Sequence, residues 1–396
     1  MNSILSPNAA RSMFLCGICI LMTTLAFALG EDRRNYILIA AMGLSPLILV
    51  FTPSISGNDI KMYFIIMLSI FCPLLNHPES MRWSTVLYGC MFCLYFISLC
   101  HLLVFSNASQ NDIMKVLKCL IFAYAIVLMI QQLCVLFGLP IFNVSNYSIR
   151  EPWKLNSLMS EPEHSGRMVG LLMYSYLTVK SIISGKESFA ESWKSEKLLW
   201  CAFLWCMLTS LSAGAYLFLL IVLTKFMTSK NFLQITFILL VFFFIANFLI
   251  ESVALERFIK FSSAALTFDI NKMCQADLSA ALRIVPSILC IQHIDLSTID
   301  GWFGHGIDYV STFMSNYING VETGYTGGGL FLTAVEYGFL VFIVLAVITF
   351  RLCYDKNNKI PTIFFWVFSV LFVGMNSQIT WSTITMLYIV KCSKQI

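Results

Sequence analysis

Charged side chains are the scarcest feature of this sequence. They make up only 12% of the 396 residues, whereas hydrophobic residues make up 58%. The mean hydropathy is accordingly high, at +0.80. Soluble globular proteins carry about 25% charged residues. This shortage of charge excludes a chain whose main solvent is water. It predicts an all-α polytopic membrane protein that forms a single integral membrane domain over residues 1–396.

Cysteine chemistry and concentrated charge are also missing. The 14 cysteines lie mostly inside apolar runs, where they behave as small hydrophobic residues, so no disulfide framework is predicted. Only Cys274 and Cys290 fall in a long loop, and whether they are bridged stays open. The net charge of +4 comes from basic residues scattered over short loops, so no nucleic-acid partner is expected.

Long apolar runs dominate the chain. A helix needs about 20 apolar residues to cross a bilayer, and the sequence predicts about twelve such transmembrane helices. A signal peptide is the alternative for the first run, but no small-residue cleavage site is evident, so we interpret it as a span. The predicted spans are 13–30, 36–51, 60–75, 84–105, 114–138, 165–184, 197–211, 213–228, 232–250, 329–350, 360–377 and 379–391.

The distribution of lysine and arginine predicts the orientation. With both termini in the cytoplasm, fifteen of the 25 basic residues fall on the cytoplasmic side and six fall in the short loops opposite. The other four lie in a long loop, which the positive-inside rule discounts. Two outward segments, 139–164 and 251–328, are far longer than the usual connection of about 2–8 residues. Long loops of this kind tend to carry function.

The end of the first long segment concentrates ionisable residues directly before an apolar run. Pro162 suits the first turn of a helix and Glu163 its positive end, so ordinary capping is one interpretation. Arg167 would lie about one turn into the span, where an ionisable residue is a functional hypothesis by default. The ionisable residues here are Arg150, Glu151, Lys154, Glu161, Glu163, His164 and Arg167.

Residues 276–293, in the second long segment, have the periodicity of an amphipathic helix. Arg283 lies in a narrow polar stripe on this helix, and an arginine presented in that way suits a phosphate group. A snorkelling or salt-bridged arginine is the alternative interpretation. The predicted apolar face consists of Leu278, Ala281, Val285 and Ile288, and the polar stripe of Ser279, Arg283 and Ser287.

Two glycine-rich turns follow in the same loop. Gly304-His305-Gly306 permits close backbone approach and supplies an imidazole, although a histidine in a turn is usually structural. Tyr325, Gly327 and Gly328 lead into the next apolar run. A glycine-rich entry to a helix is a recognised anion site, and it is also an ordinary way for a loop to enter a helix.

In the predicted orientation, Arg167, Arg283 and His305 gather at the outer face together with glycine-containing helix starts. This convergence indicates a pyrophosphate site at the level of the lipid head groups. The sequence has no clustered set of aspartate and histidine. We therefore expect no metal and no other cofactor, with arginine supplying the positive charge.

These motifs resemble those of the O-antigen polymerase (Wzy) family, a relative of the O-antigen ligases, over essentially the whole chain. Residues 160–164 are similar to a Ser-Glu-Pro-Ser-His stretch before a span, and Leu208–Gly214 to a Leu-Ser-Arg-Gly segment. Arg283 with Gly304–Gly306, and Glu336-Tyr337-Gly338, are similar to the loop arginine, the Gly-x-Gly and the Glu-Phe-Gly of the family. Ala213 departs from the pattern, because an arginine is common there. Thr326-Gly327-Gly328 replaces the ligases' His-Asn segment, which favours a polymerase.

The resemblance implies a glycosyltransferase of the C type in the bacterial inner membrane, with a large helical periplasmic loop between its ninth and tenth helices. It would work without a metal and transfer a growing glycan from undecaprenyl pyrophosphate to the terminal sugar of a lipid-linked repeat unit. The implied partners are that undecaprenyl-pyrophosphate-linked oligosaccharide, membrane lipid and a chain-length regulator. An O-antigen ligase, a flippase or transporter of lipid-linked sugars, and an inert structural protein are the alternatives.

Roles for individual residues follow from the chemistry that the resemblance implies. Arg283 and Arg167, with His305 in support, would stabilise the leaving pyrophosphate. Glu161, Glu163 or His164 would be the base that accepts the proton of the acceptor hydroxyl. The residues expected to be catalytic are Glu161, His164, Arg283 and His305, and those expected to bind substrate are Arg150, Glu163, Arg167, Gly304, Tyr325, Gly327 and Gly328.

Overall fold

The chain folds into helices joined by turns and loops. The computed structural model describes residues 5–24, 35–144, 147, 149, 151–227, 260–261, 263–267, 269–318, 324 and 326–394. These described residues form no β-strand, and the predicted all-α class is confirmed for them.

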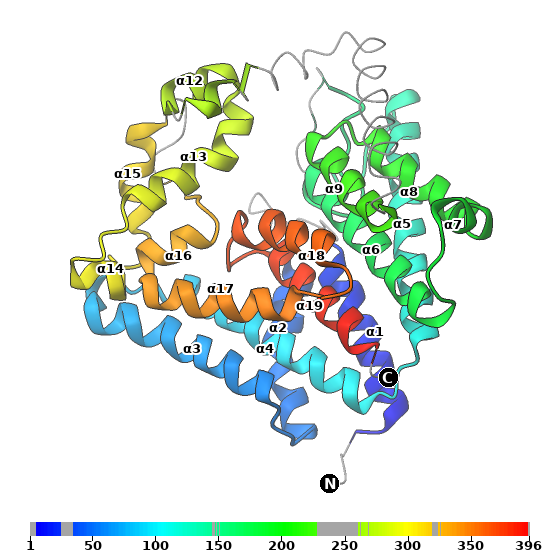
Figure 1. Ribbon diagram of the computed structural model, residues 1–396, viewed down its shortest axis with the longest axis horizontal. Helices are drawn as coiled ribbons and strands as arrows, with labels where there is room; N and C mark the ends of the chain where they lie inside the picture. Colours follow the sequence, from blue (N-terminus) through cyan, green and yellow to red (C-terminus); the bar gives the residue numbers. More distant parts are fainter. Residues whose placement is uncertain are drawn as a thin grey trace.

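The helices are shown in Figure 1. The first part of the chain forms α1 (Pro7–Met22), α2 (Tyr36–Phe51), α3 (Gly57–Asn76), α4 (Trp83–Phe105), α5 (Gln110–Leu136), α6 (Pro162–Ile183), α7 (Phe189–Ser195), α8 (Lys197–Thr209) and α9 (Ala213–Leu223). The later part forms α12 (Ile270–Ala276), α13 (Leu278–Gln292), α14 (Ile299–Phe303), α15 (Tyr309–Tyr317), α16 (Leu330–Glu336), α17 (Phe339–Cys353), α18 (Lys359–Trp366) and α19 (Gln378–Cys392). Short 3₁₀ turns follow α3 and α9, at Pro78–Ser80 and Thr224–Phe226, and a π-helical turn, Val367–Leu371, follows α18.

Ten of the predicted apolar runs coincide closely with one helix or with two consecutive pieces, whereas the helix in the run 13–30 begins earlier, as α1, and residues 25–30 lie outside the described residues. The run 232–250 lies outside the described residues. The run 329–350 is divided into α16 and α17 at Gly338, whose φ of +99° no helical residue adopts. The run 360–377 is interrupted by the π-helical turn. Hydropathy alone signals neither break, because both lie within apolar sequence.

Three described helices are long and apolar enough to cross a membrane: α3 with 20 residues, α4 with 23 and α5 with 27. Other apolar helices among the described residues are shorter, with 10–17 residues. A helix of 16 residues spans about 24 Å, less than the hydrocarbon thickness of about 30 Å. Because of the three long apolar helices, the helical structure is compatible with a membrane protein.

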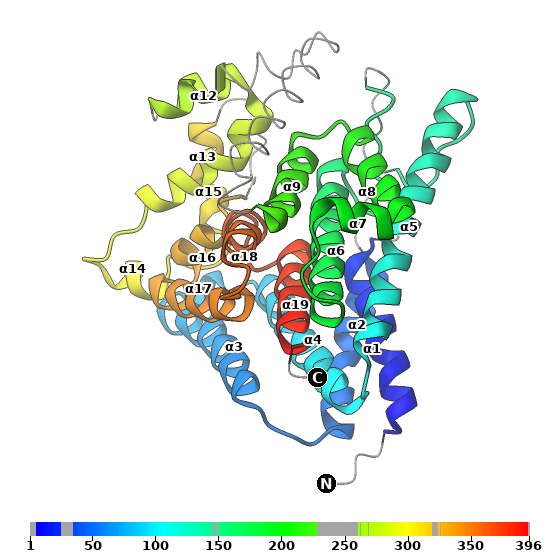
Figure 2. The ribbon, with the colours of Figure 1, turned by 45° about the vertical axis from the view of Figure 1, so that its right-hand side comes forward.

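The helices pack around two main apolar cores. The larger core joins α1–α6, α8, α9 and α16–α19, and its largest buried side chains include Trp200, Trp381, Tyr124 and Tyr174. A second core, built from Ala281, Val285, Leu289, Val310 and Met314 among others, holds α12, α13, α15 and α16 together. Figures 1 and 2 show this second group on one side of the molecule, α5–α9 on the other, and α18 and α19 between them. Residues 269–318 thus form a packed helical lobe.

Helix α6 is held tightly against α9. Gly166 lies against the backbone of Ala215, and Gly170 lies against Phe218, so the two helix axes approach closely. The first turn of α6 therefore lies next to the start of α9. This contact fixes the position of the charged residues that begin α6.

Candidate functional site

The loop before α6 is ordered by hydrogen bonds from amide side chains. Gln131, near the end of α5, accepts from the Ser157 backbone N–H (2.9 Å) and donates to the Phe142 carbonyl (3.0 Å). Asn143 donates to the Ser157 carbonyl (2.6 Å), and Asn156 donates to the Asn143 carbonyl (2.7 Å). These bonds satisfy backbone groups that would otherwise be unpaired, and they fix the entry into α6.

Helix α6 begins as its sequence predicts. Glu161 is the N-cap residue and Pro162 occupies the first helical position, where its missing N–H costs nothing. Glu163 follows in the first turn and points inward, with its side chain only 8% exposed. It lies against Gly214 at the start of α9, where any Cβ would collide with the Glu163 side chain. The position of Gly214 therefore makes room for a buried carboxylate.

Two arginines hold this carboxylate. Oε1 of Glu163 contacts Nη2 of Arg167, one helical turn later, and Oε2 contacts Nη2 of Arg283 from α13. Burial raises the pKa of the Glu163 carboxyl, but the two guanidinium groups outweigh it and hold that pKa below its ordinary value. The carboxylate is thus ionised and shared between residues far apart in the sequence. Arg283 itself is 46% exposed, so its guanidinium also faces outward.

Arg167 is anchored on its other side by the backbone of the π-helical turn. Its Nη1 donates to the Phe368 carbonyl (2.7 Å), and its guanidinium lies 5.7 Å from the centre of the Phe218 ring. Its Nε is buried and has no hydrogen-bond partner among the described residues. π-Helical turns expose carbonyl groups and recur at functional sites. Sequence reasoning missed this carbonyl, because residues 360–377 show nothing but an apolar run.

Glu161 and His164 lie beside the Arg–Glu–Arg group. His164 Nδ1 is 3.0 Å from Ser160 Oγ, and His164 Nε2 is 3.9 Å from Glu161 Oε2. Burial lowers the pKa of the His164 imidazole, and the positive charges of Arg167 and Arg283 lower it further. Together these effects outweigh the nearby carboxylates, which raise the same pKa. A neutral imidazole and a half-exposed carboxylate therefore stand next to fixed positive charge. We call Glu161, Glu163, His164, Arg167 and Arg283 the arginine cluster.

His305 lies in a different group of polar residues. Its Nδ1 is 3.8 Å from Asp300 Oδ2, and its ring stacks on Tyr309 with 4.6 Å between ring centres. Asp300 also contacts His77 Nε2 (3.2 Å), and His77 Nδ1 lies 2.9 Å from Glu79. We call His77, Glu79, Asp300 and His305 the histidine cluster. The charged neighbours of His305 are Asp300, His77, His293 and Asp295, and its support of Arg283 stays a prediction.

Backbone geometry explains why His305 lies there. Gly304 has a φ of +95°, and a Cβ on it would collide with the Glu336 carbonyl at the end of α16. The His305 N–H donates to the Val335 carbonyl (2.8 Å). Gly304 also offers its own carbonyl to Asn76 at the end of α3 (2.7 Å). Gly304 lets this turn dock closely against α16 and α3, and its role in substrate binding stays a prediction.

The second glycine-rich turn supports α13, the helix that carries Arg283. The Gly327 carbonyl accepts from Cys290 Sγ (3.7 Å), and Gly328 lies beside the same sulfur. The structure therefore places these two glycines against the back of α13. Arg150 and Tyr325, two further expected binding residues, lie outside the described residues.

The predicted helix 276–293 is confirmed as α13, with small differences in its faces. Ala281 and Val285 are buried as expected, but Leu278 is 37% exposed. Ser287, expected on the polar stripe, is buried, and its hydroxyl has no hydrogen-bond partner among the described residues. Helix α13 packs against α12, α15 and α16, so more of its surface is buried than the one apolar face that the sequence predicts. Cys274 and Cys290 are both free thiols.

The arginine cluster combines two guanidinium groups that share one carboxylate with two candidate proton acceptors. Such a set can hold a diphosphate and accept a proton from a hydroxyl group nearby. Within the described ranges no group of three or more histidine, cysteine, aspartate or glutamate side chains is placed to hold a metal ion. Comparison with models of known protein families gave no match, and a search of curated proteins found no similar sequence.

Proposed function

We propose that this chain is a polysaccharide polymerase of the bacterial inner membrane. It transfers a growing glycan from undecaprenyl pyrophosphate to the terminal sugar of a lipid-linked repeat unit at the periplasmic face. The arginine cluster is the observation that carries the proposal. Arg283 and Arg167 come from segments more than a hundred residues apart, yet both contact the carboxylate of Glu163 at the start of α6.

Polar contacts support the proposed arrangement of twelve spans with both termini in the cytoplasm. Residues assigned to the cytoplasmic side contact one another, and so do residues assigned to the outside; none of these contacts joins one side to the other. The cytoplasmic contacts are Arg11–Asp112, Gln110–Ser393, Lys118–Glu196 and Lys394–Asp355. The outer contacts are His77–Asp300, Arg82–Asp308 and Glu163–Arg283. In both views α1 begins and α19 ends in the lower half of the molecule.

The reaction exchanges one bond at the anomeric carbon of the donor sugar. The acceptor hydroxyl oxygen forms the new glycosidic bond, and the bond from that carbon to the pyrophosphate oxygen breaks. The electron pair stays on the pyrophosphate, where Arg283 and Arg167 stabilise the developing charge. The hydroxyl proton passes to Glu161 or His164, which lie within 3.9 Å of each other.

Glu163 has a positioning role in this proposal. It holds two guanidinium groups in place before substrate arrives, so that little reorganisation is needed when charge develops. Arg283 is the more exposed of the two arginines and the better placed to contact a lipid-linked diphosphate directly. Arg167, bound to the Phe368 carbonyl, keeps the inner side of the site rigid.

The proposal predicts that Arg283→Ala abolishes long-chain polymer and leaves single repeat units on the lipid A core. The variant is expressed in a deletion strain, and chain length is read from the ladder of extracted lipopolysaccharide at matched protein level. Arg82→Ala is the control, because Arg82 is also an arginine of an outer loop with one carboxylate partner, Asp308 at 2.7 Å, and lies outside the arginine cluster.

A normal ladder from the Arg283 variant at normal expression contradicts the assignment. The deletion strain itself separates the alternatives: a polymerase leaves one repeat on the core, a ligase leaves none, and a flippase traps lipid-linked units inside the cell. For the base, full activity of Glu161→Gln assigns proton acceptance to His164.

A further inference from the structure

A cavity of about 600 Å³ lies between the start of α3 and the ends of α17 and α19. Its lining residues lie in predicted cytoplasmic loops or at the predicted cytoplasmic ends of spans, so the cavity is separate from the arginine cluster. Its volume falls within the range of about 300–1,000 Å³ that is typical of small-molecule sites. The size and position of the cavity make it a candidate binding site.

The cavity is lined by three basic side chains, Lys61, Arg351 and Lys391, and among the described residues no carboxylate lines it. The two nearest acidic residues in sequence are engaged elsewhere. Asp59 contacts His101 (3.0 Å) and caps α3, and Asp355 contacts Lys394 (2.6 Å). The positive charge of the cavity is therefore not neutralised by its own walls.

Polar groups between the basic residues are already ordered. Asn58 donates to the Tyr388 hydroxyl (2.8 Å) and accepts from Lys61 Nζ (3.0 Å), and Lys391 Nζ donates to the Arg351 carbonyl (2.9 Å). Arg351 and Lys391 lie in the last turns of α17 and α19, where the helix dipole favours a cation. That explanation does not extend to Lys61, which is near the start of α3. The positive-inside rule applies to all three, and an anion in the cavity would balance their charge.

Apolar surface continues from the cavity along the same two helices. Phe64, Met67 and Phe71 are exposed on α3, and Ile343 and Val347 are exposed on α17. Helix α3 is one of the three helices long enough to cross a membrane, and it packs against α17. A molecule with an anionic head and apolar chains matches both features, whereas a free phosphate ion matches only the first.

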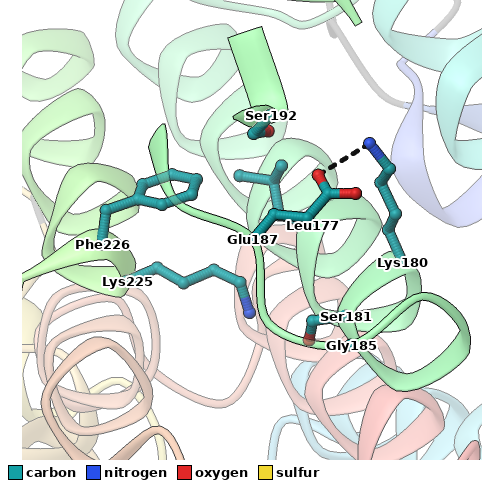
Figure 3. A pocket seen from close by; sticks show the side chains of 8 residues that line it. All are labelled: Leu177, Lys180, Ser181, Gly185, Glu187, Ser192, Lys225 and Phe226. Atoms are coloured by element: carbon teal, nitrogen blue, oxygen red, sulfur yellow. Dashed lines mark hydrogen bonds and ion pairs between the residues drawn. The ribbon is translucent and has the colours of Figure 1, made fainter. Parts of the chain in front are cut away.

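A second pocket on the same side lacks these features. It is lined by residues such as Lys180, Glu187 and Lys225 (Figure 3), and its volume is only about 20 Å³, which is enough for about one water molecule. Its Lys180 is neutralised by Glu187 at 2.9 Å. Basic residues at the cytoplasmic side are thus not always left without carboxylate partners.

We propose that the cavity between α3, α17 and α19 binds the phosphate group of an anionic phospholipid, with Lys61 and Arg351 as its principal contacts and the acyl chains along α3 and α17. The proposal requires that the chain lies in a membrane, but it does not depend on the transferase reaction. A phospholipid bound here would anchor α3 and α17 at the inner leaflet.

The test measures lipid retained by the purified full-length chain, using native mass spectrometry after incubation with phosphatidylglycerol, phosphatidylcholine or inorganic phosphate. The double variant Lys61→Gln/Arg351→Gln is compared with Lys356→Gln/Lys359→Gln, which removes the same charge from the same side outside the cavity. Loss of two charge-assisted hydrogen bonds is expected to weaken phosphatidylglycerol binding at least roughly tenfold in the first variant only. Restoring charge with Lys61→Arg/Arg351→Lys should recover most of the binding, which shows that the loss is not due to misfolding.

Equal phosphatidylglycerol binding by the two double variants overturns the proposal, since the attraction would then be general to the cytoplasmic face. Equal retention of phosphatidylcholine and phosphatidylglycerol by the unchanged chain overturns it as well. Binding of inorganic phosphate that depends on Lys61 and Arg351, without lipid retention, assigns the cavity to a free anion and rejects the phospholipid. None of these results bears on polymerase activity, so the two proposals fail independently.

Discussion

The central carboxylates of the arginine cluster and the histidine cluster differ in how much water reaches them. Glu163 and Arg167 are almost fully enclosed, whereas Asp300 in the histidine cluster is 41% exposed and Glu79 more so. Both clusters tie the lobe 269–318 to the rest of the protein, one through α6 and the other through the turn after α3. Charges that are enclosed interact strongly and are costly to leave unpaired, while exposed ones are screened by water. The comparison indicates that the arginine cluster is suited to chemistry and the histidine cluster to docking.

The largest effect is expected for Glu163→Ala, which leaves two arginines facing each other without their carboxylate. Removing one partner of a buried ion pair costs about 3–5 kcal/mol. We therefore expect a marked fall in thermal stability of the purified protein together with loss of polymer. Glu161→Ala is the matched control, since it removes a half-exposed carboxylate two residues away and should change stability by less than about 1 kcal/mol. Similar stability changes in the two variants would contradict the distinction between enclosed and exposed charge.

A smaller effect is expected for Arg167→Lys, which keeps the charge but not the geometry. Lysine cannot contact both Glu163 and the Phe368 carbonyl through a planar fork, so one buried acceptor loses its donor. The expected cost is about 1–3 kcal/mol in the free energy of unfolding. Thermal unfolding of the variant measures it, with Arg82→Lys as the exposed counterpart. Unchanged stability would mean that the π-helical turn does not depend on this arginine.

The contribution of the histidine cluster to stability should depend on pH. Hydrogen bonding to Glu79, with further contributions from Asp300, raises the pKa of His77 above its ordinary value of 6.5. A raised pKa in the folded state stabilises the protein below the unfolded value, and this contribution is lost as the pH rises through the folded value. We expect the stability difference between the unchanged protein and His77→Gln to be larger at about pH 6 than at about pH 8. Thermal unfolding at the two pH values measures it, and a difference independent of pH contradicts the assignment.

The smallest effect is expected for Arg82→Ala. Its ion pair with Asp308 is well formed at 2.7 Å, but the arginine is well exposed to solvent. Exposed pairs of this kind contribute little to stability. Thermal stability and polymer length should both match those of the unchanged protein. A loss of polymer from this variant would show that docking of the lobe 269–318 matters for activity as much as the arginine cluster does.

Local sequence patterns were sufficient to predict most of the helices. Runs of apolar residues mark α2, α3 and α4 to within a few residues, and the polar stripe around Arg283 marks α13. Pro162 and Glu163 correctly signal where α6 begins. These predictions succeed because helix formation and capping depend on neighbours within about four residues.

The candidate site was only partly predictable. Glu163 and Arg167 are four residues apart on one helix, so their pairing follows from helical spacing. The contact between Glu163 and Arg283 does not, because it depends on how α13 packs against α16 and how that lobe meets α6. The same packing directs His305 toward Asp300 and the turn after α3. Nothing in the local sequence shows that Arg283 contacts Glu163 while His305 lies beside Asp300.

The sequence by itself determined that this protein is helical and apolar, where helices such as α2, α4 and α6 begin, and which charged residues stand beside them. Only the tertiary structure decided that Arg167 and Arg283 share one carboxylate, that the Phe368 carbonyl completes the site, and that Lys61, Arg351 and Lys391 line one cavity. The reason is physical. Helix propensity and hydrophobicity act locally, whereas a buried charge is tolerated only where distant segments bring it a partner.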